Sequence, residues 1–60
     1  MDGKKELRNN ILHLIKSGKA KTAHEIEEEL KVGLLHIDTE LKMLEMERKI
    51  YHTGGSYRII

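Results

Sequence analysis

Residues 25–50 read EIEEELKVGLLHIDTELKMLEMERKI, and the spacing of their apolar residues decides the fold. Ile37, Leu41 and Leu44 recur at i, i+4 and i+7, the spacing that lines one face of a helix. The pattern therefore predicts a helix over 34–48 that turns these three side chains toward a core.

A shorter helix is expected just before it. Thr22 and Glu25 form the pattern S/T-x-x-E, in which each side chain accepts a hydrogen bond from a backbone amide that is unpaired at a helix start. We predict a helix over 23–31 and a three-residue turn at Lys31-Val32-Gly33. Its apolar stripe comprises Ala23, Ile26 and Leu30.

The N-terminal part of the chain predicts a first helix over 4–17. Ser17-Gly18 ends it, because glycine readily adopts the left-handed conformation that closes a helix. The next residues, KAKT at 19–22, lack a helical period and are expected to form no more than a short linking strand. The apolar face of the first helix comprises Leu7, Ile11, Leu14 and Ile15.

The C-terminal stretch IYHTGGSYRII predicts a β-hairpin over 50–59. Residues that favour strands flank Gly54-Gly55, and two glycines between such residues are typical of a tight primed turn. We expect Tyr57 and Ile59 to pack on the helices, and Tyr51 to be able to lie against a sugar-phosphate backbone. The expected fold class is α+β, as one domain over 1–60.

Composition restricts the kind of protein. A chain of 60 residues without cysteine has no disulfide framework and no thiolate metal site. No apolar run approaches a membrane span and the N-terminus lacks the apolar segment of a signal peptide, so we expect a soluble cytoplasmic protein with no membrane partner. The net charge of +1 is uneven: residues 1–22 carry +4, residues 23–47 carry −6, and residues 48–60 carry +3.

The predicted order of helix, short strand, helix, turn, helix and hairpin is the plan of a helix-turn-helix with an added wing. Residues 25–50 resemble the winged helix-turn-helix superfamily of prokaryotic regulators. The resemblance implies three helices, a hairpin wing and, in many members, DNA binding, although other members are protein-binding modules. The matching apolar positions are Ile26, Leu30, Val32, Ile37, Leu41, Leu44 and Ile50.

A narrower similarity lies in GKAKTAHEIEEEL, residues 18–30, which looks like the opening of winged domains that bind Z-form nucleic acid. That family uses an Asn and a Tyr on the third helix, where this sequence has Asp38 and Lys42. It also uses prolines and a Trp in the wing, where this chain has Gly54-Gly55 and Tyr57. We therefore do not assign Z-form recognition.

Five residues are expected to face outward from the third helix, on the side that would enter a major groove. They are Leu35, Asp38, Thr39, Lys42 and Met46. Only Thr39 and Lys42 are natural readers of base edges. Asp38 repels phosphates, and three glutamates on the same helix are expected to add to this field: Glu40, Glu45 and Glu47.

Affinity for DNA comes largely from phosphate contacts, and these can lie outside the reading helix. Basic residues near both ends are candidates, with Lys4, Lys5, Arg8 and His52 as additional contributors; the alternative is that they form a solvated surface that keeps the protein soluble. We predict a regulator that binds double-stranded DNA as a dimer. Its DNA-binding residues would be Lys19, Lys21, Leu35, Thr39, Lys42, Lys49 and Arg58.

A protein-interaction or dimerisation module is the alternative. Leu35 and Met46 on the outward face, with Met43 and Leu12 also off the core stripes, would supply an apolar contact surface next to Asp38. The competing interpretation is that both methionines fill gaps at the edge of the core. Leu34 is expected at the core margin, whereas Leu35 has no packing explanation.

The sequence predicts no enzyme, catalytic residue, metal or cofactor. The four histidines fall on four different elements, and His24 with Glu28 supplies only two of the ligands that a metal site needs. Sixty residues leave no room for a large substrate cavity, and no Ser-His-acid or Cys-His set is present. The histidines are His13, His24, His36 and His52.

Overall fold

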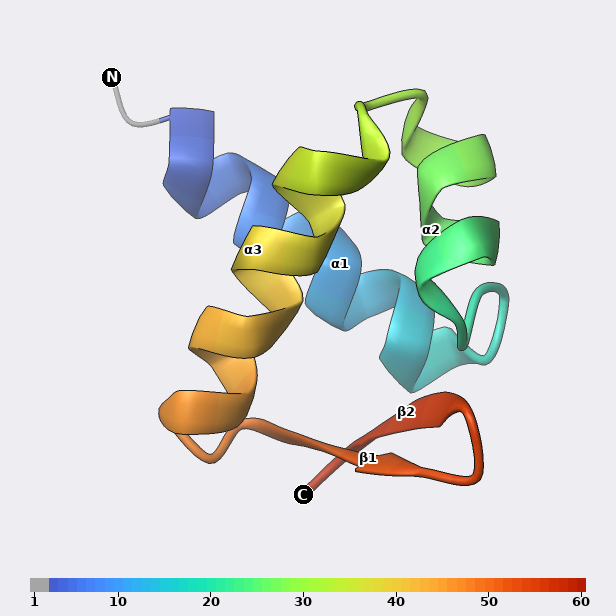
Figure 1. The fold of residues 1–60 in the computed structure, drawn as a ribbon, viewed down its shortest axis with the longest axis vertical. Helices are drawn as coiled ribbons and strands as arrows, with labels where there is room; N and C mark the ends of the chain where they lie inside the picture. Colours follow the sequence, from blue (N-terminus) through green and yellow to red (C-terminus); the bar gives the residue numbers. More distant parts are fainter. Residues whose placement is uncertain (1–2) are drawn as a thin grey trace.

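A computed structural model describes residues 3–60 as three helices followed by a two-stranded antiparallel sheet (Figure 1). The elements are α1 (Gly3–Ser17), α2 (Ala23–Leu30), α3 (Leu34–Met46), β1 (Ile50–Thr53) and β2 (Ser56–Ile59). In Figure 1, α1 crosses behind α3 and the hairpin lies at one end of the helices. The expected α+β layout, a helix-turn-helix followed by a C-terminal hairpin wing, is confirmed.

α1 ends where the sequence predicts, because the chain turns left-handed at Gly18 with φ +80°. The Gly18 amide donates to the Ile15 carbonyl at 3.2 Å, and the Ala20 amide donates to the Leu14 carbonyl at 3.4 Å. The Ser17 hydroxyl also donates to the Leu14 carbonyl, at 3.2 Å. The Leu14 and Ile15 carbonyls near the end of α1 are therefore paired, which matters for the charge at this end of the helix.

α2 begins with the predicted capping box. The Glu25 amide donates to the Thr22 hydroxyl at 3.1 Å, while the Glu25 carboxylate accepts from the amides of Lys21 at 2.9 Å and Thr22 at 3.3 Å. These backbone hydrogen bonds hold the pKa of the Glu25 carboxyl below its usual value. The carboxylate thus occupies the amides that point out of the start of α2.

The expected strand at 19–22 does not form. Only one backbone hydrogen bond joins this segment to the sheet, from the Tyr57 amide to the Lys21 carbonyl at 2.7 Å. The Ala20 side chain is fully buried, and the Lys21 amide is already used by the Glu25 carboxylate, so the segment has no row of free groups to pair with β2. It ties β2 to the start of α2 without extending the sheet.

α3 ends at Met46, two residues before the expected Arg48. Arg48 adopts φ +61°, a left-handed conformation that stops the helix, and the Lys49 amide donates to the Leu44 carbonyl at 3.0 Å. Nothing in the sequence marks this stop, since glycine is the residue that normally takes this conformation.

The hairpin has the predicted two-residue turn. β1 and β2 pair from Ile50 with Ile59 to Thr53 with Ser56, and Gly54 and Gly55 have φ +54° and +86°. Positive φ at both turn residues is the requirement of a type I′ turn, which only glycine and a few polar residues meet easily.

Most of the predicted apolar residues of α1, α2 and α3 form one core with the hairpin. Leu7, Ala23 and Leu30 are only partly buried against it. Ala20 is a buried residue that the sequence reading missed. Buried hydrophobic residues are Ile11, Leu14, Ile15, Ala20, Ile26, Ile37, Leu41, Leu44, Ile50 and Tyr57. Within residues 3–60, no helix combines the length and apolar character needed to cross a bilayer.

Candidate nucleic-acid interface

α3 has the two-sided character that the sequence predicts. Ile37, Leu41 and Leu44 are 0% exposed, whereas Leu35 is 78% and Met46 is 79% exposed. We call the exposed side the outer face of α3. It comprises Leu35, Asp38, Thr39, Lys42 and Met46.

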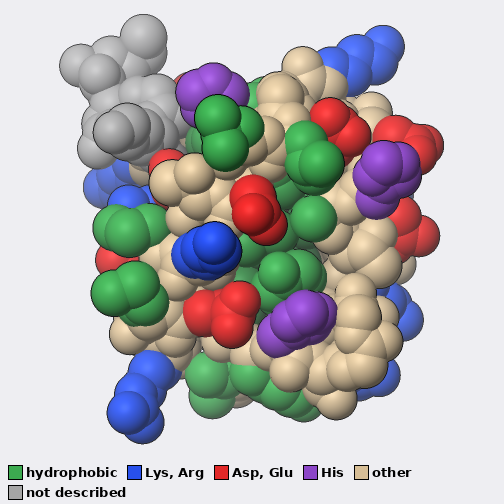
Figure 2. Space-filling view, in the orientation of Figure 1, with side chains coloured by type: hydrophobic (Ala, Val, Ile, Leu, Met, Phe, Trp, Pro, Cys, Tyr) green, Lys and Arg blue, Asp and Glu red, His purple; other side chains and the backbone are tan. Residues whose placement is uncertain are grey.

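The outer face of α3 offers few groups that read bases. The Thr39 hydroxyl donates to the Leu35 carbonyl at 2.8 Å, so its oxygen is left as an acceptor. Lys42 is its only cation. Figure 2 shows acidic, basic and hydrophobic side chains interleaved on the side of the molecule that α3 occupies, with most visible Lys and Arg side chains near the edges. By itself, the outer face of α3 would attract an anionic backbone only weakly.

Glu40 was predicted to add to the negative field on the solvent-exposed side of α3, but it does not. Its side chain is buried, and its carboxylate accepts from Arg8 Nε at 2.7 Å. Arg8 Nη1 also lies 3.4 Å from a carboxylate oxygen of Glu47. Arg8, expected to contribute to attracting phosphates, is thus paired with the carboxylates of Glu40 in α3 and Glu47 just after it, which reduces the charge that it could offer to DNA. The Lys4 side chain lies outside the described part of the structure.

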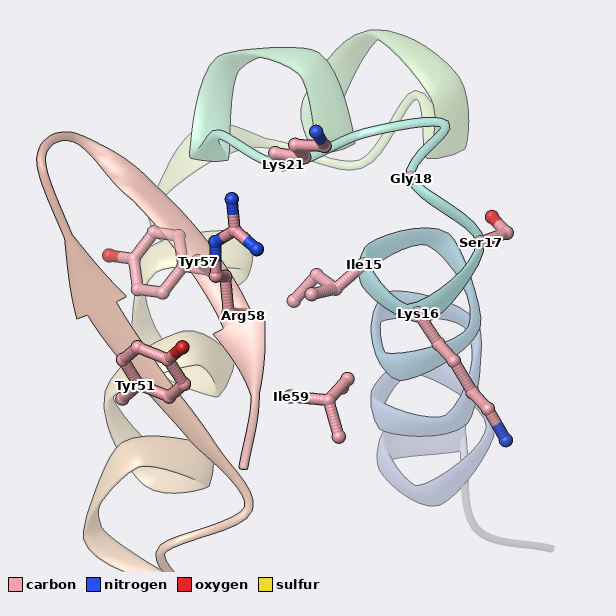
Figure 3. A pocket seen from close by; sticks show the side chains of 9 residues that line it. All are labelled: Ile15, Lys16, Ser17, Gly18, Lys21, Tyr51, Tyr57, Arg58 and Ile59. Carbon is pink, nitrogen blue, oxygen red and sulfur yellow. The ribbon is translucent and has the colours of Figure 1, made fainter.

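Two of the predicted phosphate-binding residues come together in a recess of about 360 Å³ between α1 and the hairpin (Figure 3). We call it the α1–hairpin recess. Lys21 and Arg58 reach it from different elements, and Lys16 of α1 completes a set of three exposed cations. Its lining residues are Ile15, Lys16, Ser17, Gly18, Lys21, Tyr51, Tyr57, Arg58 and Ile59.

The α1–hairpin recess is positively charged. Of the described residues that line it, none is acidic, although the chain has ten Asp and Glu residues. Within residues 3–60, Lys16, Lys21 and Arg58 form no ion pair within 4.0 Å, although the Glu25 carboxylate interacts electrostatically with Lys21. Unscreened charges around a concavity raise the local concentration of anions.

Lys19 and Lys49 do not join this recess. Lys19 is exposed in the loop after α1, where its amide donates to the Ser17 hydroxyl at 3.4 Å. The Lys49 ammonium lies 3.7 Å from the Glu47 carboxylate and borders a second recess with Arg48. The four predicted phosphate contacts thus divide into one pair that converges and two residues that stand apart.

Lys16 was not predicted as a site residue, and no neighbouring residue was predicted for Tyr51. Tyr51 is 44% exposed and lies directly opposite Arg58 in the ladder, so both side chains share one face of the hairpin. Lys16 was hidden by its place in the last turn of α1, where a basic residue has an ordinary explanation in the helix dipole. Only the packing of β2 against α1 brings it to the recess.

Exposed apolar side chains also cluster beside α2. Leu34 is 42% exposed, more than the expected core margin, and with Ala23, Leu35 and Asp38 it lines a recess of about 390 Å³. Exposed apolar groups that adjoin one another in this way are typical of a contact surface.

The hairpin also orders an aromatic pair, His52 stacked on Tyr57 with ring centroids 4.5 Å apart and an interplanar angle of 9°. Burial of the Tyr57 phenol, reinforced by Glu45 and Asp38, raises its pKa above the usual value. His24 lies 4.0 Å from Glu27, and no group of three potential ligands in residues 3–60 forms a metal site.

Comparison of the chain with models of known families, with curated proteins and with solved structures gave no match. Membership of a winged helix-turn-helix superfamily therefore stays a prediction from the sequence.

Proposed function

We propose that this protein is a small winged helix-turn-helix protein that binds double-stranded DNA. The outer face of α3 faces the major groove with Thr39 and Lys42 toward the bases, and basic residues of the loop and the hairpin hold phosphates on either side. A cytoplasmic regulator that docks as a dimer is the form of this proposal that the fold favours.

One observation carries the proposal: Lys21 and Arg58, which are far apart in the sequence, both border the α1–hairpin recess, whose described lining residues include no acid. Their convergence is what a clamp on an anionic backbone needs, because phosphate contacts supply most non-specific affinity for DNA. The exposed Lys42 on α3 adds a positive charge between the clamp and the bases. The acidic residues of α3 limit the affinity, while the cations that contact phosphates make the proposed complex sensitive to salt.

The test is a titration of a fluorescent duplex of about 20 base pairs, followed by anisotropy, over salt from about 20 to 200 mM. The logarithm of the affinity should fall with the logarithm of salt by about 0.9 per phosphate contacted, which gives a slope between about −1.8 for the converging pair and about −3.6 for all four predicted contacts. Absence of binding at the lowest salt would falsify the proposal.

A protein-interaction module is the second candidate function. It is favoured by the recess that Leu34, Leu35, Ala23 and Asp38 form, because it joins apolar surface to one negative charge. Such a surface suits dimerisation or a partner segment that is apolar and basic. Leu35→Lys should then abolish self-association in light scattering while circular dichroism and the thermal midpoint stay close to wild type, and an unchanged mass would count against this candidate.

A further inference from the structure

We propose that the α1–hairpin recess is a seat for a phosphate oxyanion. Naming the source of that phosphate rests on the proposed function: it is a backbone phosphate of the bound duplex, outside the groove that α3 faces. The inference adds Lys16 and Tyr51 to the interface and separates the phosphate seat from the outer face of α3.

The charge of the recess selects an anion. Figure 3 shows Arg58 extending from β2 toward the side of the recess where Lys21 lies, while Lys16 borders the recess from α1 with its ammonium pointing away from Arg58. The guanidinium is the group that binds a phosphate through two parallel hydrogen bonds, whereas the flexible lysines act as point charges. Arg58 therefore supplies the directed hydrogen bonds and Lys21 the nearby charge, while Lys16 reaches a bound phosphate only by turning its flexible stem toward the recess.

The end of α1 does not cancel this charge. A helix C-terminus carries a partial negative charge from its unpaired carbonyls. Here the Leu14 and Ile15 carbonyls accept from the amides of Ala20 and Gly18, and the Leu14 carbonyl also accepts from the Ser17 hydroxyl. Two of the carbonyls at this end of α1 are thus paired, which reduces the negative potential that the cations of the recess must outweigh.

The start of α2 offers no competing seat. Backbone amides at a helix start commonly bind phosphate. In this protein the Glu25 carboxylate takes the amides of Lys21 and Thr22, so an anion would meet a negative charge at that place. The Glu25 carboxylate interacts electrostatically with Lys21 but does not line the recess. A phosphate that approaches α2 is therefore directed to Arg58 and Lys16.

The recess is held in place by rigid elements. The hydrogen bond from the Tyr57 amide to the Lys21 carbonyl at 2.7 Å fixes the loop to β2, and the ladder places Tyr51 directly opposite Arg58. The Tyr51 hydroxyl, on the same face of the hairpin as Arg58, is a donor suited to a phosphate oxygen. Cations that need little reorganisation bind an anion with a smaller loss of entropy.

The first experiment uses inorganic phosphate as the probe, with NMR amide shifts of the whole chain recorded against chloride at equal ionic strength. Phosphate should shift the amides of Gly18, Lys21 and Arg58, and Arg58→Lys should remove these shifts because it keeps the charge but loses the two-pronged geometry. Shifts that survive Arg58→Lys unchanged, or that are equal in chloride, overturn the phosphate seat.

The second experiment uses duplex DNA with a matched pair of variants. Lys16→Gln and Lys31→Gln each remove one exposed lysine near the end of a helix, and Lys31 lies beyond α2, away from the recess. One lost phosphate contact weakens binding by about eightfold at about 0.1 M salt and lowers the salt slope by about 0.9. Lys16→Gln should show both changes, and Lys31→Gln neither.

The outcomes separate this inference from the proposed function. If the wild type binds duplex but the recess amides stay still and the two lysine variants behave alike, the phosphate seat is wrong and DNA binding stands. If the wild type binds no duplex while inorganic phosphate still shifts the recess amides, the seat stands for a free phosphate compound and its assignment to DNA is wrong.

Discussion

The outer face of α3 and the α1–hairpin recess differ in almost every property that decides nucleic-acid binding. The outer face of α3 carries one cation and one acid, and it leaves Leu35 and Met46 78% and 79% exposed. The α1–hairpin recess is concave, is bordered by three cations and has no acid among its described lining residues. In the proposed complex, attraction to an anionic backbone and contact with bases would thus belong to different parts of the molecule.

The difference has a physical consequence for selectivity. Charge attracts any duplex regardless of sequence, whereas base discrimination needs directed donors and acceptors in a groove. α3 provides Lys42 and one acceptor at Thr39, so most of the proposed affinity would be independent of sequence. The apolar residues of the outer face of α3, Leu35 and Met46, are equally suited to contact thymine methyls or a protein partner.

The largest expected effect tests whether α3 is two-sided at all. Leu41→Ala removes a fully buried side chain and should lower the free energy of unfolding by about 2–5 kcal/mol, which is most of the stability of so small a domain. Leu35→Ala removes the same atoms from the outer face and should change it by less than about 0.5 kcal/mol. Urea denaturation followed by circular dichroism measures both, and similar losses in the two variants would show that α3 is oriented differently.

The next prediction sets the recess against the outer face in DNA binding. The double variant Lys21→Gln/Arg58→Gln loses two phosphate contacts and should bind duplex about sixtyfold more weakly at about 0.1 M salt. Lys42→Gln loses at most one, an effect of about eightfold. Anisotropy titrations give both ratios, with Lys31→Gln as the control for net charge. A larger loss for Lys42→Gln than for the double variant would reverse the assignment of affinity to the recess.

A smaller effect, with the opposite sign, comes from Asp38. A carboxylate about 7 Å from a phosphate in water is repelled by about 0.6 kcal/mol, so Asp38→Asn should strengthen DNA binding about threefold at low salt. Glu6→Gln makes the same change in net charge on the exposed surface of α1 and serves as the control. Equal affinities for the two variants would mean that the outer face of α3 does not approach the DNA, which favours the protein-interaction candidate.

Most of the fold could be predicted from local sequence patterns, because all the residues of each pattern lie close together in the chain. The capping box at Thr22 and Glu25, the turn at Gly54-Gly55 and the stripe of Ile37, Leu41 and Leu44 depend on neighbours within one or two turns. The end of α3 at Met46 could not be predicted, because it depends on Arg48 adopting a left-handed conformation that its side chain disfavours.

The site was less predictable, because its pairs are distant in sequence. Arg8 and Glu40 are 32 residues apart, and no pattern on either helix shows that they meet, so both were assigned to the solvent-facing field. Lys16 and Arg58 adjoin one recess only because β2 packs on α1. Residue types therefore suggested a basic surface, while tertiary packing decided which of its charges remain available.

The smallest effect links the two regions through Tyr57. Burial raises the pKa of the Tyr57 phenol above its usual 10.0, and Glu45 and Asp38 of α3 raise it further. A phenol whose folded pKa is raised stabilises the fold fully below its unfolded pKa of about 10, and this contribution is lost as pH rises through the folded value. Asp38→Asn removes one negative charge and should lower the folded pKa of Tyr57, so the loss of stability, which begins near pH 10, is complete at a lower pH. An NMR titration of the Tyr57 ring carbon in the wild type and in Asp38→Asn measures the shift, with Glu6→Gln as the control. An unchanged midpoint in Asp38→Asn would mean that solvent screens Asp38 from the hairpin and that the two regions are electrostatically independent.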